Sequence, residues 1–349
     1  MSKLRKMLKP ISLLYGEVVK VRNKMYDNGM LKSTRFDVPT IVVGNLSVGG
    51  TGKSPMIEYL IRLLQDNHRV AVLSRGYKRT SKGFQIATKN TTVLEIGDEP
   101  MQFFKKFTNI IVAVDAKRVH GIKQLKVLDN PPEVILLDDA FQHRKVQGGF
   151  NILLTPYYNL YVDDYMLPSG DLRENIEGAK RADVIIVTKC PSDLKEKEQY
   201  KITEKLKIAL TQNAYYTKID YDDFIYSKKN KIKLTNLKDY QIILVTGIAK
   251  TSPLTNFLKQ EQITFKHLAY KDHYHFTNKD LEKIRAIYTK IVNKKKLILT
   301  TEKDYVRTFE FAKDNIYYLP IKTEFLSTIE AGSFNKKIKK YVGQSTRNR

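Results

Sequence analysis

The first part of the chain carries apolar residues at helical spacing, with lysine and arginine between them. This pattern predicts an amphipathic helix over residues 3–25, and Pro10 is expected to kink it or to reset its start. A basic amphipathic helix can lie in a membrane interface, and it can equally dock on the protein's own core, so both interpretations stay open. The apolar positions are Leu4, Met7, Leu8, Ile11, Leu14, Val18, Val21 and Met25.

From Val38 onward, short apolar runs alternate with helical stretches. Uninterrupted apolar runs of this length are typical of strands buried in a parallel sheet. The order of the elements therefore predicts an α/β fold, a mostly parallel sheet covered by helices on both faces. The predicted strands are Thr40–Val43, Val70–Leu73, Val93–Ile96, Ile110–Val114, Val134–Leu137, Ile152–Leu154 and Val184–Val187, and the predicted helices include Met56–Leu64, Met101–Phe107 and Val119–Val127.

Residues 191–240 are polar, rich in lysine and weakly patterned, apart from a helix expected near Thr203–Leu210. A new strand–helix alternation follows, and it predicts a second, smaller α/β domain. Its elements are the strand Ile242–Val245, the helix Pro253–Gln260, the strand Thr264–Ala269, the helix Asp280–Val292 and the strand Leu297–Thr300. We therefore expect a basic N-terminal helix (1–30), a core domain (31–215), a smaller α/β domain (216–325) and a C-terminal basic helix or tail (326–349).

Charge narrows the choice of partners. Lysine and arginine number 61 against 37 aspartate and glutamate, a net charge of +24. Such an excess points to nucleic acid, anionic lipid or a phosphorylated substrate, or it reflects drift in a lysine-rich proteome. The excess is strong at both ends, and the tail Lys336–Arg349 is expected to be a frayed basic end.

The single cysteine, Cys190, excludes an internal disulfide and fits a reducing compartment. The basic start is not followed by an uninterrupted apolar stretch and a small-residue cleavage site, so no secretory signal is expected. No run of about 20 apolar residues is present, so no membrane-spanning helix is expected either.

Candidate chemistry begins with the segment Ser47–Ser54, which joins a predicted strand to a predicted helix. Its glycines allow backbone N–H groups to turn around a phosphate, and the following helix adds its N-terminal dipole. Lys53 would reach the β- and γ-phosphates, and the Ser54 hydroxyl would ligate Mg²⁺. The usual pattern has glycine where Ser47 stands. The alternative is a plain glycine-rich connection. The expected phosphate-binding residues are Gly49, Gly50, Thr51, Gly52, Lys53 and Ser54.

A second part of a nucleotide site is expected on a neighbouring strand. Residues 133–139 form an apolar strand that ends in Asp138 and Asp139, as a strand that holds Mg²⁺ should. Successive side chains of a strand point to opposite faces, so only one of the two can face the nucleotide unless the chain turns. The alternative is a carboxylate that caps the next element.

Three further segments allow two interpretations each. Gly97–Pro100 supplies either a carboxylate base with a metal-supporting neighbour, or an ordinary helix start with an acidic N-cap and proline at the first helical position. Ser74–Arg79 is either a site for an anionic sugar-containing substrate or a solvated basic loop. His273 is either structural or catalytic, and the Asp272-His273-Tyr274-His275 cluster has no convincing third metal ligand.

Together these stretches resemble one family, the tetraacyldisaccharide 4'-kinases of lipid A synthesis in Gram-negative bacteria. The departure at Ser47 is shared by that family, Ser54 stands where the family often has threonine, and Ala140 stands where it usually has glycine. The similar segments follow one another in consistent order. They are Val43–Pro55, Leu73–Arg79, Gly97–Pro100, Leu137–His143, Leu167–Glu174, Asp272–His273 and Thr300–Asp304.

The resemblance implies a P-loop NTPase-like kinase with ATP and Mg²⁺ as cofactors. It would phosphorylate the 4'-hydroxyl of a tetraacylated glucosamine disaccharide 1-phosphate to give lipid IVA. By the same resemblance, Asp98 is the general base and His273 is its partner across a cleft between the domains. The resemblance implies that the Mg²⁺ ligands are Ser54, Glu99, Asp138 and Asp139. It implies that the residues in contact with substrate or phosphates are Arg75, Tyr77, Arg118, Gln142 and Arg173.

The resemblance also implies a peripheral protein on the cytoplasmic face of the inner membrane. Its partners would be the lipid A disaccharide precursor and the anionic membrane surface, with no nucleic acid and no stable protein partner. The N-terminal helix would dock on the inner leaflet and help to bind acyl chains. Two rivals are a nucleotide-dependent switch that phosphorylates no acceptor, and a basic nucleic-acid-binding ATPase, although no nucleic-acid motif is recognisable.

Overall fold

The computed structural model describes residues 5, 7–272, 274–309 and 315–347, and the chain forms two compact units. The first unit comprises Met1–Ile219 together with Thr323–Arg349, and the second comprises Asp220–Lys322. The C-terminal segment thus groups with the first unit, although it follows the second unit in the sequence.

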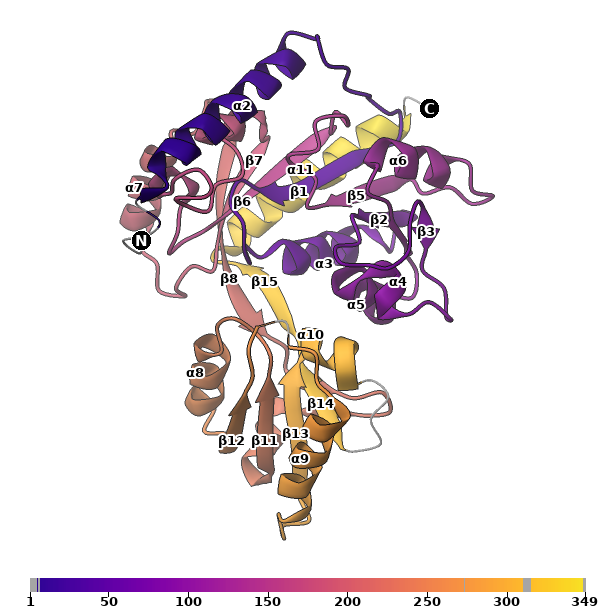
Figure 1. Ribbon diagram of the computed structural model, residues 1–349, viewed down its shortest axis with the longest axis vertical. Coiled ribbons are helices and arrows are strands. Elements are labelled where there is room, and N and C mark those ends of the chain that lie inside the picture. Colours follow the sequence, from indigo (N-terminus) through magenta and orange to yellow (C-terminus); the bar gives the residue numbers. More distant parts are fainter. Residues whose placement is uncertain (1–4, 6, 273, 310–314, 348–349) are drawn as a thin grey trace. The chain divides into compact units, whose positions relative to one another are not determined.

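A nine-stranded sheet forms the centre of the first unit, in the order β15-β8-β7-β6-β1-β5-β2-β4-β3 (Figure 1). Every neighbouring pair from β8 to β4 is parallel, and β3 pairs antiparallel with β4. This confirms the predicted α/β class. The strands are β1 Thr40–Asn45, β2 Val70–Ser74, β3 Gln85–Ile86, β4 Ile111–Val114, β5 Val134–Asp138, β6 Phe150–Pro156, β7 Val184–Thr188, β8 Asn213–Tyr221 and β15 Ile321–Phe325.

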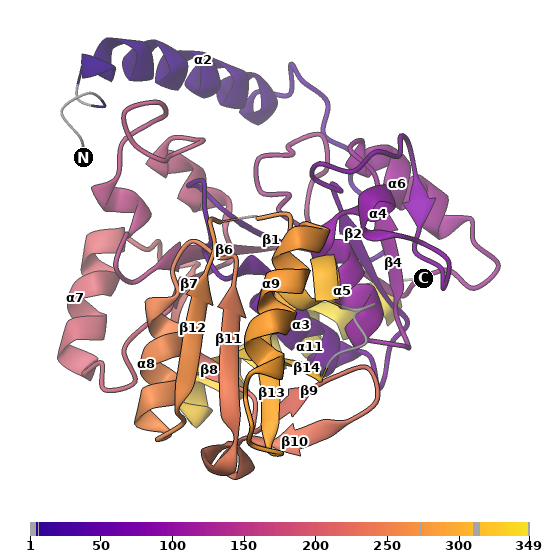
Figure 2. The same cartoon turned by 60° about the horizontal axis from the view of Figure 1, so that its bottom comes forward.

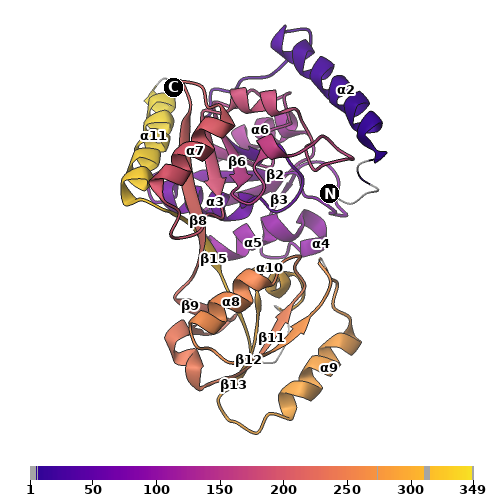
Figure 3. The ribbon, with the colours of Figure 1, turned by 90° about the vertical axis from the view of Figure 1, so that its left-hand side faces the viewer.

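Helices pack on this sheet because its strands are apolar on both faces. Val42 of β1 shares a buried cluster with Ile122 and Leu125 of α6. Tyr59 of α3 donates a hydrogen bond to Asn335 of α11 at 2.9 Å, and Figure 3 shows α11 and α2 on opposite sides of the unit. The helices are α2 Lys9–Asp27, α3 Lys53–Leu64, α4 Val93–Ile96, α5 Asp98–Lys106, α6 Arg118–Lys126, α7 Glu196–Leu206 and α11 Thr328–Arg347, with 3₁₀ turns η1 Tyr161–Asp163 and η2 Ile176–Arg181.

The prediction of a strand at Val93–Ile96 is wrong, because this segment is the short helix α4. Thr92 and Glu95 form a capping box at its start, and the backbone N–H of Thr92 donates to the Glu95 carboxylate at 2.6 Å. A segment of four residues, three of them apolar, is too short for its hydrophobic periodicity to distinguish a helix from a strand. The local capping contacts therefore decide the conformation.

Of the two alternatives for the C-terminal segment, helix or frayed tail, the described residues form a helix, α11, which continues to Arg347. Phe334, Ile338 and Val342 of α11 are fully buried, and their spacing of four residues places them along one side of the helix. Lys336 and Lys339 lie between them on the exposed side. The many lysines conceal an apolar stripe that packs into the first unit.

The remaining differences concern α2 and the weakly patterned stretch. Pro10 lies in the first turn of α2, so it sets the start of the helix and does not kink it. Helix α7 begins at Glu196, earlier than expected, and β8 follows it. Strand β8 escaped prediction because polar residues interrupt its apolar ones, although Tyr215 and Tyr216 are buried.

The second unit is built on a six-stranded sheet in the order β10-β9-β14-β13-β11-β12 (Figure 2). The four strands from β14 to β12 run parallel, while β9 pairs antiparallel with both β10 and β14. Its strands are β9 Phe224–Tyr226, β10 Lys231–Lys233, β11 Gln241–Thr246, β12 Phe265–Ala269, β13 Lys296–Thr301 and β14 Ile316–Leu319.

Successive side chains of β11 point to opposite faces of the sheet, and this unit therefore has a hydrophobic core on each face. Leu244 packs with Leu254 of α8, whereas Val245 packs with Ile284 of α9, so the two helices cover opposite faces of the sheet. The helical elements are α8 Ser252–Gln260, α9 Asn278–Thr289, α10 Glu302–Asp304, the 3₁₀ turn η3 Leu234–Asp239 and the π-helical turn η4 Tyr305–Phe309. Among the described residues, no helix is long and apolar enough to cross a bilayer.

Candidate active site

The segment Ser47–Ser54 joins β1 to α3, as the glycine spacing predicted. Gly52 precedes the helix with φ of 94°, a left-handed conformation that a Cβ would strain. Helix α3 begins at Lys53, so its N-terminal amides and its dipole point at the loop. Thr188, at the end of β7, donates from its hydroxyl to the carbonyl of Thr51 at 2.7 Å and fastens the loop to the sheet. This is the geometry of a phosphate-binding loop.

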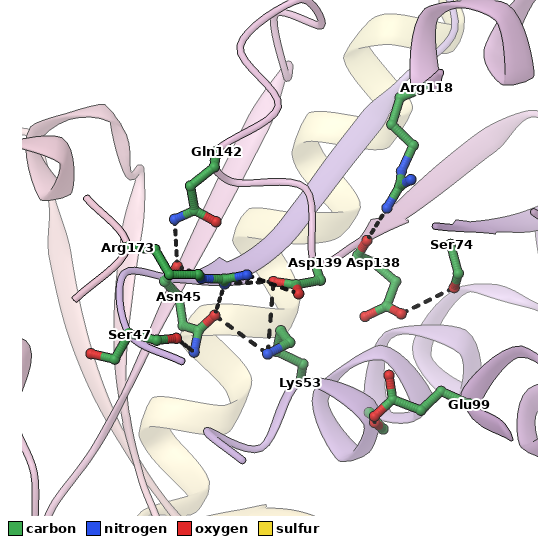
Figure 4. Close-up of polar contacts among 11 residues, drawn as sticks. Asn45, Ser47, Lys53, Ser74, Glu99, Arg118, Asp138, Asp139, Gln142 and Arg173 are labelled. Atoms are coloured by element: carbon green, nitrogen blue, oxygen red, sulfur yellow. Dashed lines mark hydrogen bonds and ion pairs between the residues drawn. The ribbon is translucent and has the colours of Figure 1, made fainter. Parts of the chain in front are cut away.

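Lys53 lies in a group of polar side chains at the ends of β1 and β5 (Figure 4). Its Nζ is 3.3 Å from Oδ1 of Asn45 and 3.7 Å from Oδ1 of Asp139. Arg173 donates to both oxygens of Asp139, at 2.8 and 3.2 Å, and to Oδ1 of Asn45. Two cations thus share one carboxylate and one amide beside the phosphate loop.

The two carboxylates after β5 point in different directions, because the chain turns between them. Asp139 has φ of 46°, and this left-handed turn carries its side chain to Lys53 and Arg173. Asp138 is buried and accepts a hydrogen bond from the Ser74 hydroxyl at 3.0 Å. The turn places both carboxylates in the site, which an extended strand would not.

Their pKa values move in opposite directions. Burial, with the nearby charges of Glu99 and Asp139, raises the pKa of Asp138 to about 7. Burial also acts on Asp139, but hydrogen bonds from Arg173 and the charge of Lys53 hold the pKa of Asp139 below its usual value. The site therefore keeps Asp139 ionised beside two cations.

Helix α5 brings Asp98 and Glu99 to the phosphate loop. Both lie in its first turn, after Gly97 in a left-handed conformation, and Pro100 is the third helical residue. The predicted start, with an acidic cap and proline at the first helical position, is therefore shifted by two residues. The Ser54 hydroxyl donates to Oε1 of Glu99 at 3.0 Å.

One turn further along the two helices, a buried carboxylate repeats the contact between α3 and α5. Glu58 of α3 is 1% exposed and accepts a hydrogen bond from Gln102 at 2.8 Å. It also pairs with Lys106 at 2.7 Å and with Arg62 at 3.1 Å. These contacts fix α5, and with it Asp98 and Glu99, against the helix of the phosphate loop.

Arg118, an expected contact for substrate or phosphates, lies in the interior of the first unit. It is 2% exposed, and its guanidinium donates to the main-chain oxygens of Asp115 at 2.8 Å and Asp138 at 3.0 Å. Burial lowers the pKa of Arg118 to about 10. The side chain joins the ends of β4 and β5 behind the two carboxylates.

The other expected substrate contacts differ in exposure. Arg75 and Tyr77 follow β2 and are exposed, with Tyr77 at 75%. Gln142 donates from Nε2 to the main-chain oxygen of Asn45 at 2.7 Å and so lies beside Arg173. His273 lies outside the described residues.

The structure adds two site residues that sequence reasoning missed. Asn45 contacts Lys53 and Arg173, and Ser74 contacts Asp138. Asn45 falls inside the Val43–Pro55 segment, and each of the two is the last residue of a strand that ends at the site. That position is the signal that identifies them, because carboxyl ends of parallel strands meet at one edge of a sheet.

The motif Thr300–Asp304 forms a separate network inside the second unit. Asp304 is fully buried and accepts hydrogen bonds from the Gly247 amide and the Thr301 hydroxyl, each at 2.8 Å. Arg307 pairs with Asp304 at 3.6 Å and donates to the Tyr274 carbonyl at 3.3 Å. This network holds together the segments that follow β11, β12 and β13.

A parallel sheet with a glycine-rich loop, a lysine at the helix start and carboxylates on the adjacent strand defines a P-loop nucleotide-binding protein. A sequence model of the tetraacyldisaccharide-1-P 4'-kinase family matches residues 4–342. The chain belongs to this family.

Individual relatives agree over the whole length. Tetraacyldisaccharide 4'-kinase of Flavobacterium johnsoniae is 49% identical, with 99% of each chain covered. The enzyme of Flavobacterium psychrophilum is 50% identical with both chains covered completely, and that of Bacteroides thetaiotaomicron is 46% identical with 99% of this chain and 95% of the relative covered.

A solved structure shares the fold as well. The crystal structure of LpxK from Aquifex aeolicus in complex with ATP has 31% sequence identity and a TM-score of 0.78, and the match covers 97% of this chain and 99% of that one. The recognition of the family and of the P-loop kinase fold from sequence is therefore confirmed.

Proposed function

We propose that this protein transfers the γ-phosphoryl group of MgATP to the 4'-hydroxyl of a tetraacylated glucosamine disaccharide 1-phosphate, giving lipid IVA. The observation that carries the proposal is the group formed by Lys53, Asp139 and Arg173 at the phosphate loop. Family membership and the ATP complex of the Aquifex relative support the same reaction. Phosphoryl transfer depends on alignment and on neutralising charge, and a loop with two adjacent cations supplies both.

Nucleotide binding would use the amides of Gly49–Ser54 and the ammonium of Lys53. Asp139 and Asn45 contact the Lys53 ammonium, so these two side chains would hold it in place for the β- and γ-phosphates. Arg173 would add a second positive charge on the same side. Because Lys53 is only 13% exposed, its charge acts with little screening by water.

The residues present fit Mg²⁺. Ser54, Glu99, Asp138 and Asp139 gather at the loop, and Oδ1 of the buried Asp138 has no hydrogen-bond partner among the described residues. Within the described part of the chain, no group of three or more His, Cys, Asp and Glu forms a metal site by itself. Mg²⁺ typically uses one or two carboxylates together with substrate phosphates and water, so the set suits this ion. When bound, the ion would neutralise charge on the transferred phosphoryl group.

The acceptor must lose a proton during transfer. We assign this proton to the carboxylate of Asp98, which stands in the first turn of α5 next to Glu99. His273 would orient that carboxylate and share the proton, as the family resemblance suggests. Glu99 would remain with Ser54 at the metal, so neighbouring carboxylates would have different roles.

Substrate contacts are assigned by exposure. Arg75 and Tyr77 are exposed after β2 and would meet the anionic sugar substrate. Gln142 and Arg173 would contact the phosphates near Asn45. We assign Arg118 a positioning role, because its donors hold the main chain at Asp138.

We further propose that the protein works as a peripheral protein on the cytoplasmic face of the inner membrane. On α2, Leu13, Leu14 and Val18 are more than 60% exposed, and lysines and arginines lie along the same helix. An exposed apolar face with basic flanks suits an anionic lipid surface. The acceptor is itself a lipid, so its kinase must reach it at the membrane.

The decisive experiment is mass spectrometry of the disaccharide after incubation with MgATP. One added phosphate on the acceptor is expected, and Lys53→Ala should remove it because the clamp on the β- and γ-phosphates is lost. ATP turnover that releases ADP without phosphorylating the acceptor, or that depends on added DNA or RNA, would overturn the proposal.

A further inference from the structure

Helix α2 carries its apolar and polar faces in the reverse of the usual orientation. The exposed side carries Ile11, Leu14, Val18 and Val21, each between 55 and 69% exposed and spaced by three and four residues. The side that faces the protein carries mainly small and polar residues, and its buried members are Ser12, 6% exposed, and Tyr26, 8% exposed. Amphipathic helices of soluble proteins normally bury the apolar stripe. The contacts of α2 with the first unit are therefore largely polar, with the buried ring of Tyr26 under the Arg144 guanidinium as an exception.

Three side chains of α2 make polar contacts with one segment, Met166–Glu174, while a fourth, Asp27, pairs with Arg144 at 2.6 Å. The Ser12 hydroxyl accepts a hydrogen bond from the Ser169 amide at 2.9 Å. The Tyr15 hydroxyl donates to the main-chain oxygen of Arg173 at 3.1 Å. Asn23 donates from its amide to Oε1 of Glu174 at 2.7 Å, and Glu174 is 2% exposed.

The same segment is also joined to the phosphate loop. The Arg173 amide donates to the Leu46 carbonyl, and the Val48 amide donates to the Asp171 carbonyl, both at 2.7 Å. The Arg173 side chain continues to Asp139 and to Asn45 (Figure 4). Met166–Glu174 thus lies between α2 on one side and the phosphate loop with its carboxylate on the other.

Arg173 is the residue at which these contacts converge. Its amide is held by Leu46, its carbonyl by Tyr15, and its guanidinium by Asp139 and Asn45. The Tyr15 contact is the one that comes from α2, and it fixes the peptide plane that follows the arginine. A change at Tyr15 therefore reaches the guanidinium through the backbone to which it is attached.

We propose that Tyr15, with Ser12 and Asn23, is a positioning residue for Arg173, so that the inner face of α2 sets the geometry of the phosphate site while its outer face serves the lipid surface. This inference rests on the proposed function, because it takes α2 as the lipid-facing helix and Arg173 as part of the kinase site. It separates two roles within one helix. Docking on the membrane and alignment of the phosphate site become linked through Met166–Glu174.

Tyr15→Phe tests the inference, because it removes one hydroxyl and keeps the ring. A single hydrogen bond corresponds to a change of about two- to tenfold, so we expect kcat to fall by about that factor. The KM for lipid and the partitioning onto anionic vesicles should not change, since the outer face is intact. The matched control is Tyr200→Phe, an exposed tyrosine of α7 at 65% exposure, which should match the unchanged protein in every assay.

A double-mutant cycle separates positioning from general stability. If Tyr15 acts through Arg173, Tyr15→Phe should cost little in an Arg173→Lys background, because contacting residues are non-additive. Asn23→Ala should reproduce the effect of Tyr15→Phe on kcat by loosening the neighbouring residue Glu174. An unchanged kcat for Tyr15→Phe, or losses that multiply fully with those of Arg173→Lys, would overturn the inference.

Amide hydrogen exchange gives a readout that needs no turnover. The amides of Val48 and Arg173 should exchange faster in Tyr15→Phe than in Tyr200→Phe, because the segment that they join is loosened. Faster exchange in a protein that phosphorylates no lipid would refute the proposed kinase and leave the link between α2 and the loop in place. Normal transfer with unchanged exchange and unchanged kcat would refute the link alone.

Discussion

The hydroxyl of Ser54 donates a hydrogen bond to Oε1 of Glu99 at 3.0 Å, so the first turn of α3 meets the first turn of α5. One helix carries the phosphate loop and the other carries the carboxylates Asp98 and Glu99. This contact brings two segments 45 residues apart into one site. A hydroxyl and a carboxylate at hydrogen-bond distance are also a pair that Mg²⁺ can bridge.

Removal of the Ser54 hydroxyl should weaken the metal site. We expect Ser54→Ala to lower kcat by about 10- to 100-fold and to raise the Mg²⁺ concentration needed for the half-maximal rate. Ser54→Thr keeps the hydroxyl and is the matched control, with activity close to normal. Initial rates measured over a Mg²⁺ titration check both variants, and an unchanged Mg²⁺ requirement in Ser54→Ala would confine the hydroxyl to its contact with Glu99.

Asp98 and His273 should act as one base. A carboxylate by itself is a weak acceptor for the proton of a sugar hydroxyl, and a partner that shares the proton strengthens it. Asp98→Asn and His273→Ala should each reduce kcat by about 10²- to 10⁴-fold while nucleotide affinity stays near normal. The double variant should be scarcely worse than the poorer single variant. Rates at saturating lipid and ATP decide the matter, and losses that multiply would mean two independent roles.

The outer face of α2 should control membrane binding. Leu14→Ser combined with Val18→Ser removes two side chains that are 69 and 62% exposed, and partitioning onto anionic vesicles should fall about tenfold or more. The KM for lipid should rise and ATP binding should not change. Ile329→Ser is the control, since Ile329 is 83% exposed on α11 and should not affect sedimentation with vesicles. Equal partitioning of all three proteins would remove α2 from the membrane contact.

The buried carboxylate of Glu58 should be important for stability. It pairs with Lys106 and Arg62 and accepts a hydrogen bond from Gln102, so its loss removes the anion that compensates the largely buried Lys106 and the acceptor of the buried Gln102 amide. Glu58→Ala should lower the free energy of unfolding by about 3 kcal/mol. Arg62→Ala removes only the partner that is 43% exposed and should cost less than about 1 kcal/mol. Urea unfolding of both variants measures the difference, and equal losses would contradict the assigned burial.

Acid should destabilise the fold through His143. Burial, together with the positive charges of Arg118, Lys145, Arg75 and Arg22, lowers the pKa of His143 to about 4. Between the ordinary value of about 6.5 and that value, the unfolded chain binds a proton that the folded chain does not. Above about pH 6.5, His143 is neutral in both the folded and the unfolded chain and does not make stability depend on pH. Below that value, protonation of the unfolded chain lowers the free energy of unfolding as the pH drops toward 4.

His143→Gln is the variant that checks this sign. Stability of the variant should fall less steeply with decreasing pH between about 6.5 and 4, because glutamine binds no proton. Denaturant unfolding at a series of pH values in this window measures the slope. Parallel curves for the two proteins would assign the acid sensitivity to other groups.

Much of this protein was determined by sequence alone. Strands such as Val70–Ser74 and Val134–Asp138 are apolar throughout because they are buried on both faces, and that pattern is local. The phosphate loop could also be recognised from the sequence, because only glycine adopts the left-handed conformation found at Gly52 without strain. These features depend on neighbours in the chain, so the chain itself specifies them.

Tertiary structure decided which face of a helix is covered. The stripe on α2 and the stripe on α11 have similar helical spacing, yet Phe334 and Ile338 are buried while Leu14 and Val18 are exposed. Periodicity states that a face is apolar and says nothing of what covers it. Contacts with residues far away in the sequence decide which face is buried. For α11 they include the hydrogen bond between Asn335 and Tyr59, and for α2 they include the polar contacts with Met166–Glu174.

The site shows the same division. The sequence predicts the place of Lys53 and Ser54 in the loop, whereas it gives no sign that the side chain of Arg118 is buried and donates to the main chain of Asp138. The left-handed turn at Asp139 has no sequence signal, because an aspartate after a strand is compatible with either an extended or a turned backbone. Only the assembled sheet, where Arg173 and Lys53 attract that carboxylate from other segments, determines that both aspartates enter the site.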